Sequence, residues 1–194
     1  GHDGGITTVS ALPDVTGDGL NELVVHDYTG GTHCCNFTRI FSFDTEEPRA
    51  LLSLGTGHCE VELLDLDGDA RAEVQTCDDR FAYVFCSFAD SPKPTVVLAF
   101  DAGTGHFELA TRRFVSEMPE PSIQALRAQI SAADRRADVQ RCVALGAVID
   151  RLYADGEDSA LRLLDAIYDR SDRAVLWPKL LEIARSSPLY SAGG

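Results

Sequence analysis

The 194-residue sequence has no long hydrophobic run and no excess of positive charge. Because no apolar stretch approaches the roughly 18–20 residues that span a bilayer, we expect no membrane insertion. Acidic residues outnumber basic ones by 31 to 17, which gives a formal net charge of −14. A surface with this charge repels nucleic acid and attracts cations, so we expect no nucleic-acid partner.

Sequence motifs of the common enzyme classes are also missing. The chain contains no Gly-x-Ser-x-Gly nucleophile elbow, no phosphate-binding glycine loop and no zincin motif. His33 directly precedes Cys34, and neighbouring residues of a strand point to opposite faces, so the two are not placed as base and nucleophile. We therefore expect a non-catalytic protein.

Charge and periodicity divide the chain into two parts. Residues up to Met118 include 20 acidic and 7 basic side chains, whereas from Pro119 onward the numbers are 11 and 10. Short β-branched and aromatic segments fill the first part, and apolar residues at helical spacing fill the second. The sequence predicts an α+β fold with an antiparallel β-rich domain at residues 1–117 and a small α-helical region at 118–194 packed on it.

The predicted strands are bounded by Gly and Asp and alternate between apolar and polar positions. Phe81, Tyr83 and Phe85 alternate in this way, and such an aromatic row is typical of a strand in the core. The strands are predicted at residues 6–12, 22–26, 36–43, 50–54, 59–64, 73–77, 81–88, 95–100 and 106–114.

Four helices are predicted after residue 121. Ser122 is placed to cap the first helix, and Ser131-Ala-Ala-Asp134 resembles a capping box before a second helix that ends near Tyr153. A third helix follows residues 155–156. The last covers residues 172–184 and is expected to start or kink near Pro178.

Two segments of the β-rich part, residues 14–22 and 65–73, repeat each other. Each lies between predicted strands, and their first aspartates are 51 residues apart, the size of one four-stranded propeller unit. Oxygen-bearing side chains stand at positions 1, 3, 5 and 9 of each segment, and the backbone carbonyl of position 7 would add a ligand. The candidate metal ligands are Asp14, Thr16, Asp18, Leu20 and Glu22 in one loop, and Asp65, Asp67, Asp69, Arg71 and Glu73 in the other. Ca²⁺ takes six to eight oxygens at about 2.3–2.6 Å, so we predict one or two Ca²⁺ sites.

The same loop sequences have two other interpretations. An EF-hand requires a bidentate Glu at position 12 and flanking helices, but Val25 and Thr76 occupy that position and strands flank both loops. A simple Asx turn between strands remains an alternative, because Asp and Gly are common turn residues. A turn gives no reason to gather several carboxylates, which repel one another without a cation.

The pattern Asp-x-[Asn/Asp/Thr]-Gly-Asp-Gly-x-x-[Asp/Glu] between strands resembles the FG-GAP/VCBS repeats of integrin α-chain propellers and of many bacterial secreted proteins. The resemblance covers about residues 6–115 and implies blade-like sheets with Ca²⁺ bound through positions 1, 3, 5, 7 and 9. Thr16 and Ala70 depart from the family pattern, and Ala70 is disfavoured if position 6 needs a left-handed backbone. Two units are too few to close a propeller, so we expect the C-terminal helices to cover an exposed edge or face of the β-rich part.

The six cysteines favour an oxidising compartment, and we expect a secreted or periplasmic protein. The disulfide candidates are Cys34, Cys35, Cys59, Cys77 and Cys86. Cys34 and Cys35 are expected to pair with different partners, because they point to opposite faces of a strand. Cys142 either stays a reduced thiol or bridges the helices to the β-rich part, and all fifteen pairings of six cysteines stay open.

Three functions remain. The leading hypothesis is a non-catalytic, calcium-binding, extracytoplasmic β module that interacts with a protein or glycan. The second is a periplasmic inhibitor or immunity protein, which a small acidic module would suit. The third is a transition-metal or redox site, which no CxxC or HxxxH spacing supports. Its residues would be His33, Cys34, Cys35, His58 and Cys59.

Overall fold

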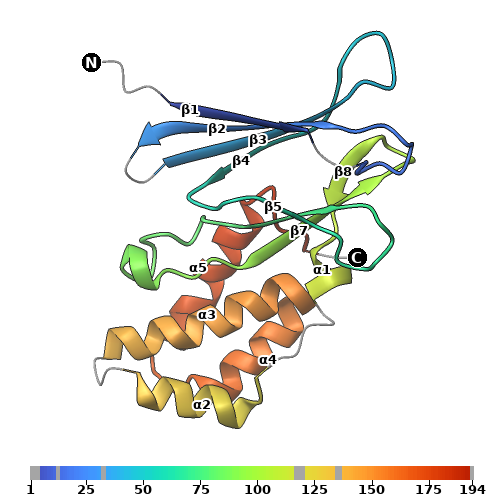
Figure 1. The fold of residues 1–194 in the computed structure, drawn as a ribbon. Helices are drawn as coiled ribbons and strands as arrows, with labels where there is room; N and C mark the ends of the chain where they lie inside the picture. The colour runs from blue at the N-terminus through green and yellow to red at the C-terminus, as the bar shows by residue number, and fades with distance from the viewer. Residues whose placement is uncertain (1–4, 12–13, 32–33, 116–120, 134–136, 193–194) are drawn as a thin grey trace. The chain divides into compact units, whose positions relative to one another are not determined.

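The computed structural model describes residues 5–11, 14–31, 34–115, 121–133 and 137–192 (Figure 1). Within these residues it confirms the α+β fold: two four-stranded antiparallel sheets are followed by five helices, and neither a barrel nor a propeller is closed. The chain divides into two compact units, Gly1–Cys77 with Val96–Ala110 and Asp78–Thr95 with Thr111–Gly194. The units interleave along the sequence, whereas the sequence analysis placed a single boundary after residue 117. That the helices pack on the β-rich part stays a prediction.

The first sheet is an antiparallel meander in which each strand pairs with the next. Val24, Ile40 and Leu52 lie in one row across three strands and are at most 8% exposed, so this face forms the core. On the opposite face the Phe37 ring lies over Gly55, where a Cβ would come within 2.9 Å of the ring. The strands are β1 (Ile6–Ala11), β2 (Leu23–Gly31), β3 (Cys34–Ser42) and β4 (Arg49–Gly57).

The second sheet has the same simple strand order. Its strands are β5 (Glu62–Leu64), β6 (Glu73–Cys77), β7 (Thr95–Asp101) and β8 (His106–Leu109). Val74 and the consecutive residues 96–98 are at most 5% exposed, so β7 is covered on both faces. The acidic loop 14–22 joins β1 to β2, and the acidic loop 65–73 joins β5 to β6. Each loop therefore connects the first two strands of its own sheet.

The predicted strand at residues 81–88 is wrong. This segment forms turns that lead into the short 3₁₀ helix η1 (Phe88–Asp90), and Tyr83 adopts a positive φ of 61°, which interrupts an extended chain. Phe81 is fully buried and packs edge-on against Tyr153 of the helical part, with ring centroids 6.3 Å apart. The aromatic residues at every second position from Phe81 therefore do not form the face of a strand. Phe81 is a single buried ring in a loop.

A buried carboxylate also ties this segment to the helices. Asp78 is 2% exposed and accepts hydrogen bonds from the Tyr153 hydroxyl at 2.7 Å and from the Ser187 hydroxyl. Burial, together with the neighbouring Asp78 charge, raises the pKa of Tyr153. The phenol therefore stays protonated and donates to the buried carboxylate.

The helices are α1 (Thr111–Val115), α2 (Ile123–Ala132), α3 (Ala137–Asp155), α4 (Glu157–Ile167) and α5 (Arg173–Arg185). The predicted cap of α2 is confirmed, because the Ala125 amide donates to Ser122 Oγ at 3.2 Å. The short α1 was not predicted; it begins where the strand predicted at 106–114 has already ended at Leu109.

One detail of the predicted helices was wrong. Ser131 lies inside α2 and donates to the Arg127 carbonyl at 2.8 Å, so it does not begin a capping box; Asp134 lies outside the described residues. Pro178 lies inside α5 and not at its start, and the alternative of a kink there stays a prediction. The core of the helical unit is formed by side chains that are fully buried: Leu145, Ile149, Leu152, Leu164 and Leu180.

Candidate metal centre

The two acidic loops share one backbone conformation. Position 4 has φ of 80° at Gly17 and 79° at Gly68, and position 6 has φ of 86° at Gly19 and 69° at Ala70. A left-handed backbone suits glycine, since other L residues lose about 1–2 kcal/mol there. Position 6 is therefore left-handed in both loops, which is the condition under which Ala70 is disfavoured, and Ala70 occupies it at a steric cost.

The first aspartate of each loop holds this backbone in place. Asp14 accepts hydrogen bonds from Gly17 N at 2.6 Å and Gly19 N at 2.7 Å. Asp65 accepts the equivalent bonds from Gly68 N at 2.7 Å and Ala70 N at 3.1 Å. Asp14 Oδ1 also accepts from Asp18 N at 3.1 Å and from Thr16 Oγ1 at 3.3 Å, so the lone pair left for a cation is on Oδ2. Asp65 accepts its two bonds on separate oxygens and has room for a further ligand on each.

The glutamate at position 9 ends each loop inside the protein. Glu22 is 1% exposed and accepts from Val15 N at 2.7 Å, and Glu73 is 4% exposed and accepts from Leu66 N at 2.8 Å. The sequence analysis proposed these glutamates as metal ligands but not this bond to position 2. The available signal was that Glu22 and Glu73 each open a predicted strand, 22–26 and 73–77, and that position 2 of each loop is apolar.

Three carboxylates converge in each loop. Asp14, Asp18 and Glu22 each offer an oxygen within 4.8 Å of the others, and so do Asp65, Asp67 and Glu73. Thr16 adds a hydroxyl to the first group, since its Oγ1 lies 3.3 Å from Asp14 Oδ1 and 3.4 Å from Glu22 Oε1. The two clusters could each hold a metal ion. That the predicted residues bind one, including the carbonyls of Leu20 and Arg71, stays a prediction.

The loops differ at position 5. Asp18 belongs to its cluster and also accepts from Leu20 N at 2.8 Å. Asp69 lies outside the corresponding cluster of three and is paired with the side chain of Arg71, whose Nε donates to it at 2.9 Å. The sequence analysis assigned only the carbonyl of Arg71 to the site. Its guanidinium instead supplies the second loop with a positive charge.

The Arg71 side chain also brings the two loops together. A Cβ placed on Gly17 of the first loop would lie 3.1 Å from Arg71 Cδ, so the stem of this arginine passes over the glycine. Both loops belong to the first compact unit. A change in Arg71 is therefore expected to affect the second loop directly and the first loop by contact.

Burial and mutual repulsion shape the electrostatics of the clusters. Burial raises the pKa of Glu22, with the charges of Asp18 and Asp14 adding to the effect. Burial likewise raises the pKa of Glu73, helped by Asp67 and Asp69. The hydrogen bond from Gly19 N is the largest cause of the lowered pKa of Asp14. The first loop thus holds a buried glutamate whose ionised form lacks a compensating charge, which a bound cation would provide, whereas in the second loop Arg71 supplies part of that charge.

The cysteines whose side chains the structure describes form disulfides. Cys59 is bonded to Cys77 and Cys86 to Cys142, and Cys35 is also disulfide-bonded. No free cysteine occurs in the described part of the chain. Cys142 is therefore oxidised, and its partner lies in the segment 78–95 that belongs to the helical unit. These disulfides fit an oxidising, extracytoplasmic compartment.

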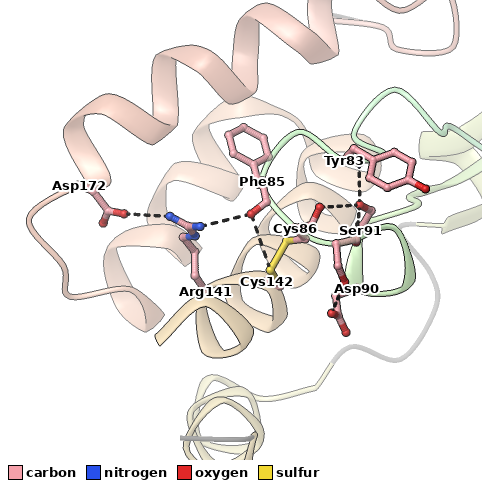
Figure 2. Close-up of a disulfide and its surroundings, with 9 residues drawn as sticks. Tyr83, Phe85, Cys86, Asp90, Ser91, Arg141, Cys142 and Asp172 are labelled. Atoms are coloured by element: carbon pink, nitrogen blue, oxygen red, sulfur yellow. Dashed lines mark hydrogen bonds and ion pairs between the residues drawn. A yellow bond between two sulfur atoms is a disulfide. The ribbon is translucent and has the colours of Figure 1, made fainter. Parts of the chain in front are cut away.

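The surroundings of the Cys86–Cys142 disulfide are polar (Figure 2). Arg141 donates from Nη2 to the Phe85 carbonyl at 3.4 Å, and its Nη1 lies 3.8 Å from Asp172 Oδ2. Arg141 thereby links three parts of the helical unit around the disulfide, namely the segment 78–95, α3 and the residue before α5.

The proposed His/Cys metal site loses two of its cysteine ligands. The Cys59 sulfur is bonded to Cys77 and Cys35 is also disulfide-bonded, so neither is available as a thiolate. His33 lies outside the described residues, as does the side chain of Cys34. Among the residues that the structure describes, the two acidic clusters are the groups with metal-ligand geometry, and neither contains His or Cys.

Comparisons with known proteins give limited similarity. No family model matches the chain, and no solved structure matches it. A probable thylakoid lumen protein of Synechocystis sp. (strain PCC 6803) is 34% identical over 80 residues, which cover 39% of this chain and 23% of that protein. The chain therefore matches about a quarter of that relative's length. None of the described helices is both long and apolar enough to cross a membrane.

Proposed function

We propose that this chain is a non-catalytic, calcium-binding β module of an extracytoplasmic compartment, secreted or periplasmic, that interacts with a protein or glycan partner. The observation that carries the proposal is the repeated loop: the same backbone, the same capping aspartate and the same buried glutamate recur at the same place in both sheets. A turn alone requires the capping aspartate, but it does not require a converging group of three carboxylates.

Calcium is the cation that suits these ligands best. Carboxylate, hydroxyl and carbonyl oxygens are hard ligands, and the loops offer them in numbers that water can complete to six or more. Mg²⁺ demands a stricter octahedral shell at shorter distances, whereas Ca²⁺ tolerates irregular cages such as a nine-residue loop. The bound ion would offset most of the negative charge of each cluster and fix the junction between the first two strands of each sheet.

The compartment is inferred from two independent facts. The disulfides fit an oxidising environment, and the partial relative is described as a probable thylakoid lumen protein, which lies outside the cytoplasm. Calcium at millimolar levels, as outside cells, would also saturate sites of modest affinity.

Thermal unfolding with calcium and with EGTA tests the calcium proposal. At roughly a hundred times the dissociation constant, a single site adds about 2.7 kcal/mol, which raises Tm by about 5–10 °C for a protein of this size. The double variant Asp14→Asn with Asp65→Asn should lose this calcium-dependent increase.

Asp101→Asn is the matched control. Asp101 caps the β7–β8 turn by accepting from Gly103 N and Thr104 N, both at 2.8 Å, and it belongs to neither acidic cluster. The control should lower Tm equally in calcium and in EGTA. A Tm of the wild type that is the same in both buffers would refute calcium binding.

The partner needs a separate experiment. Co-purification with the protein, from the envelope fraction of its own source, should recover a protein or glycan whose binding is lost in EGTA. Recovery of one stoichiometric enzyme would instead support the inhibitor hypothesis, which stays a prediction.

A further inference from the structure

A cavity of about 470 Å³ lies in the helical unit, and none of its lining residues belongs to the acidic loops. Its lining residues all belong to that unit, and its volume is within the range of small-molecule sites. Leu126 of α2 and Leu163 of α4 contribute apolar walls. One face of α3 forms the remaining long wall, through Val143, Gly146, Ala147, Asp150, Arg151 and Ala154.

Gly146 keeps this cavity open. It lies in the middle of α3, where glycine costs about 1 kcal/mol relative to alanine. A Cβ placed on Gly146 would meet nothing within 4 Å, so no close backbone contact explains the glycine. Because Gly146 has no side chain, the cavity extends up to the backbone of α3 at this position.

The cavity contains one uncompensated charge. Asp150 makes no hydrogen bond or ion pair with the residues that the structure describes, and the burial of its carboxyl group raises its pKa to about 6. The residue is nevertheless open to solvent, as a group on the wall of a concave site can be. The neighbouring Arg151 does not compensate it, because its guanidinium lies 3.3 Å from Asp155 Oδ2 and 3.4 Å from Ser159 Oγ.

We propose that this cavity binds a small organic cation, an amine on an apolar body, whose ammonium group pairs with the Asp150 carboxylate. Charge complementarity selects this class of ligand. An anion would be repelled by Asp150, and a neutral apolar ligand would desolvate the carboxylate without giving it a partner. A bare metal ion would find one carboxylate where it needs several oxygen ligands. The proposal is independent of calcium binding by the loops.

Adamantylamine is a suitable probe, because it joins a rigid apolar cage to a single ammonium group. Isothermal titration of the full chain should detect its binding. Adamantanol, the neutral analogue, should bind at least tenfold more weakly, and adamantanecarboxylate should not bind. Equal affinity for the amine and the alcohol, or no binding of the amine, would overturn the proposal.

Three variants locate the site. Asp150→Asn should weaken amine binding at least tenfold, and Gly146→Leu should abolish it by filling the cavity. Asp158→Asn is the control, because it removes the same charge from an exposed position outside the cavity and should leave affinity unchanged. Should Gly146→Leu fail to fold, the Asp150→Asn result decides, and unchanged amine affinity in that variant contradicts the proposal.

The pH dependence gives a further readout. Asp150 and Arg151 are the ionisable groups among the described lining residues, and only Asp150 changes charge near neutrality. Amine affinity should therefore rise about tenfold from pH 5 to pH 7 as this carboxyl group ionises. In Asp150→Asn the affinity should be flat over the same range, and a wild type with no dependence would contradict the assignment.

Discussion

In loop 14–22 and loop 65–73, carboxylates hold the same five backbone amides, at positions 2, 4, 5, 6 and 7. Only the second loop also contains a basic side chain, Arg71, which is paired with Asp69. The first loop has no positive charge of its own to set against its three carboxylates. The comparison separates two properties: hydrogen bonds define the shape of the loop, and the charge balance determines how strongly it needs a cation. We expect the first loop to be the stronger calcium site.

Removal of the position 9 glutamate should have the largest effect. Glu22→Ala leaves the amide of Val15, a fully buried residue, without its acceptor and should lower the free energy of unfolding in EGTA by about 2–4 kcal/mol. Glu73→Ala should cost less, about 1–2 kcal/mol, because Leu66 is only half-buried. Urea unfolding provides the measurement.

Glu22→Gln controls for charge, since it keeps an acceptor oxygen and should recover most of the loss. Equal losses for the two alanine variants would contradict the claim that burial distinguishes the loops.

Arg71→Ala should make the second loop more like the first, by raising its affinity for calcium. It frees Asp69 to bind the ion and removes a nearby positive charge, so calcium affinity of the second loop should rise about tenfold. Calorimetric titration in the Asp14→Asn background isolates this loop. Arg39→Ala, which breaks the Asp27 pair outside both clusters, should not change the affinity. A lower affinity of Arg71→Ala would mean that the arginine supports the site.

Exchanging glycine and alanine at position 6 should change the free energy of unfolding by about 1 kcal/mol, with opposite sign in the two loops. Ala70→Gly relieves the left-handed alanine and should stabilise the protein, whereas Gly19→Ala introduces the same strain and should destabilise it. Thermal unfolding in EGTA is the measurement. Ala128→Gly, in the middle of α2, should be destabilising, which shows that glycine is not generally favourable. Destabilisation by Ala70→Gly would refute the strain argument.

The dependence of the free energy of unfolding on pH should be the smallest of these effects. Glu22 and Glu73 have raised pKa values, so the folded state binds their protons more tightly than the unfolded chain does. Stability in EGTA should therefore fall as pH rises from the ordinary value of 4.5 through the raised pKa of each glutamate. Glu22→Gln with Glu73→Gln should reduce this slope, and saturating calcium should also reduce it by favouring the ionised form. An unchanged slope in the double variant would assign the dependence to other groups.

Local patterns predicted the parts of the molecule that local interactions determine. The repeated Asp and Gly residues predicted both loops, because turn geometry depends on a few neighbouring residues. The departure of Ala70 from the glycine of the FG-GAP/VCBS pattern indicated where strain would arise if position 6 were left-handed, as it is. The change from strand to helix periodicity predicted the α+β fold, and Ser122 was identified as a cap. The residues of both acidic clusters came from the same spacing.

Long-range contacts determine the parts that were predicted wrongly or left open. Phe81 packs against Tyr153, which lies 72 residues later in the chain. The alternation of Phe81, Tyr83 and Phe85 is the pattern of a strand, and it does not reveal this long-range contact. The Cys86–Cys142 disulfide spans 56 residues, and its pairing depends on how α3 meets the segment 78–95. The pairing of the Arg71 side chain with Asp69 depends on the rotamer of the arginine, which the positions of residues in the sequence do not determine.

An anomalous difference map at a wavelength sensitive to calcium, from crystals grown in millimolar calcium, examines the acidic loops most directly. The account predicts a peak among the oxygens of Asp14, Asp18 and Glu22, with an equal or weaker peak beside Asp65. Density for water alone at both positions would contradict it.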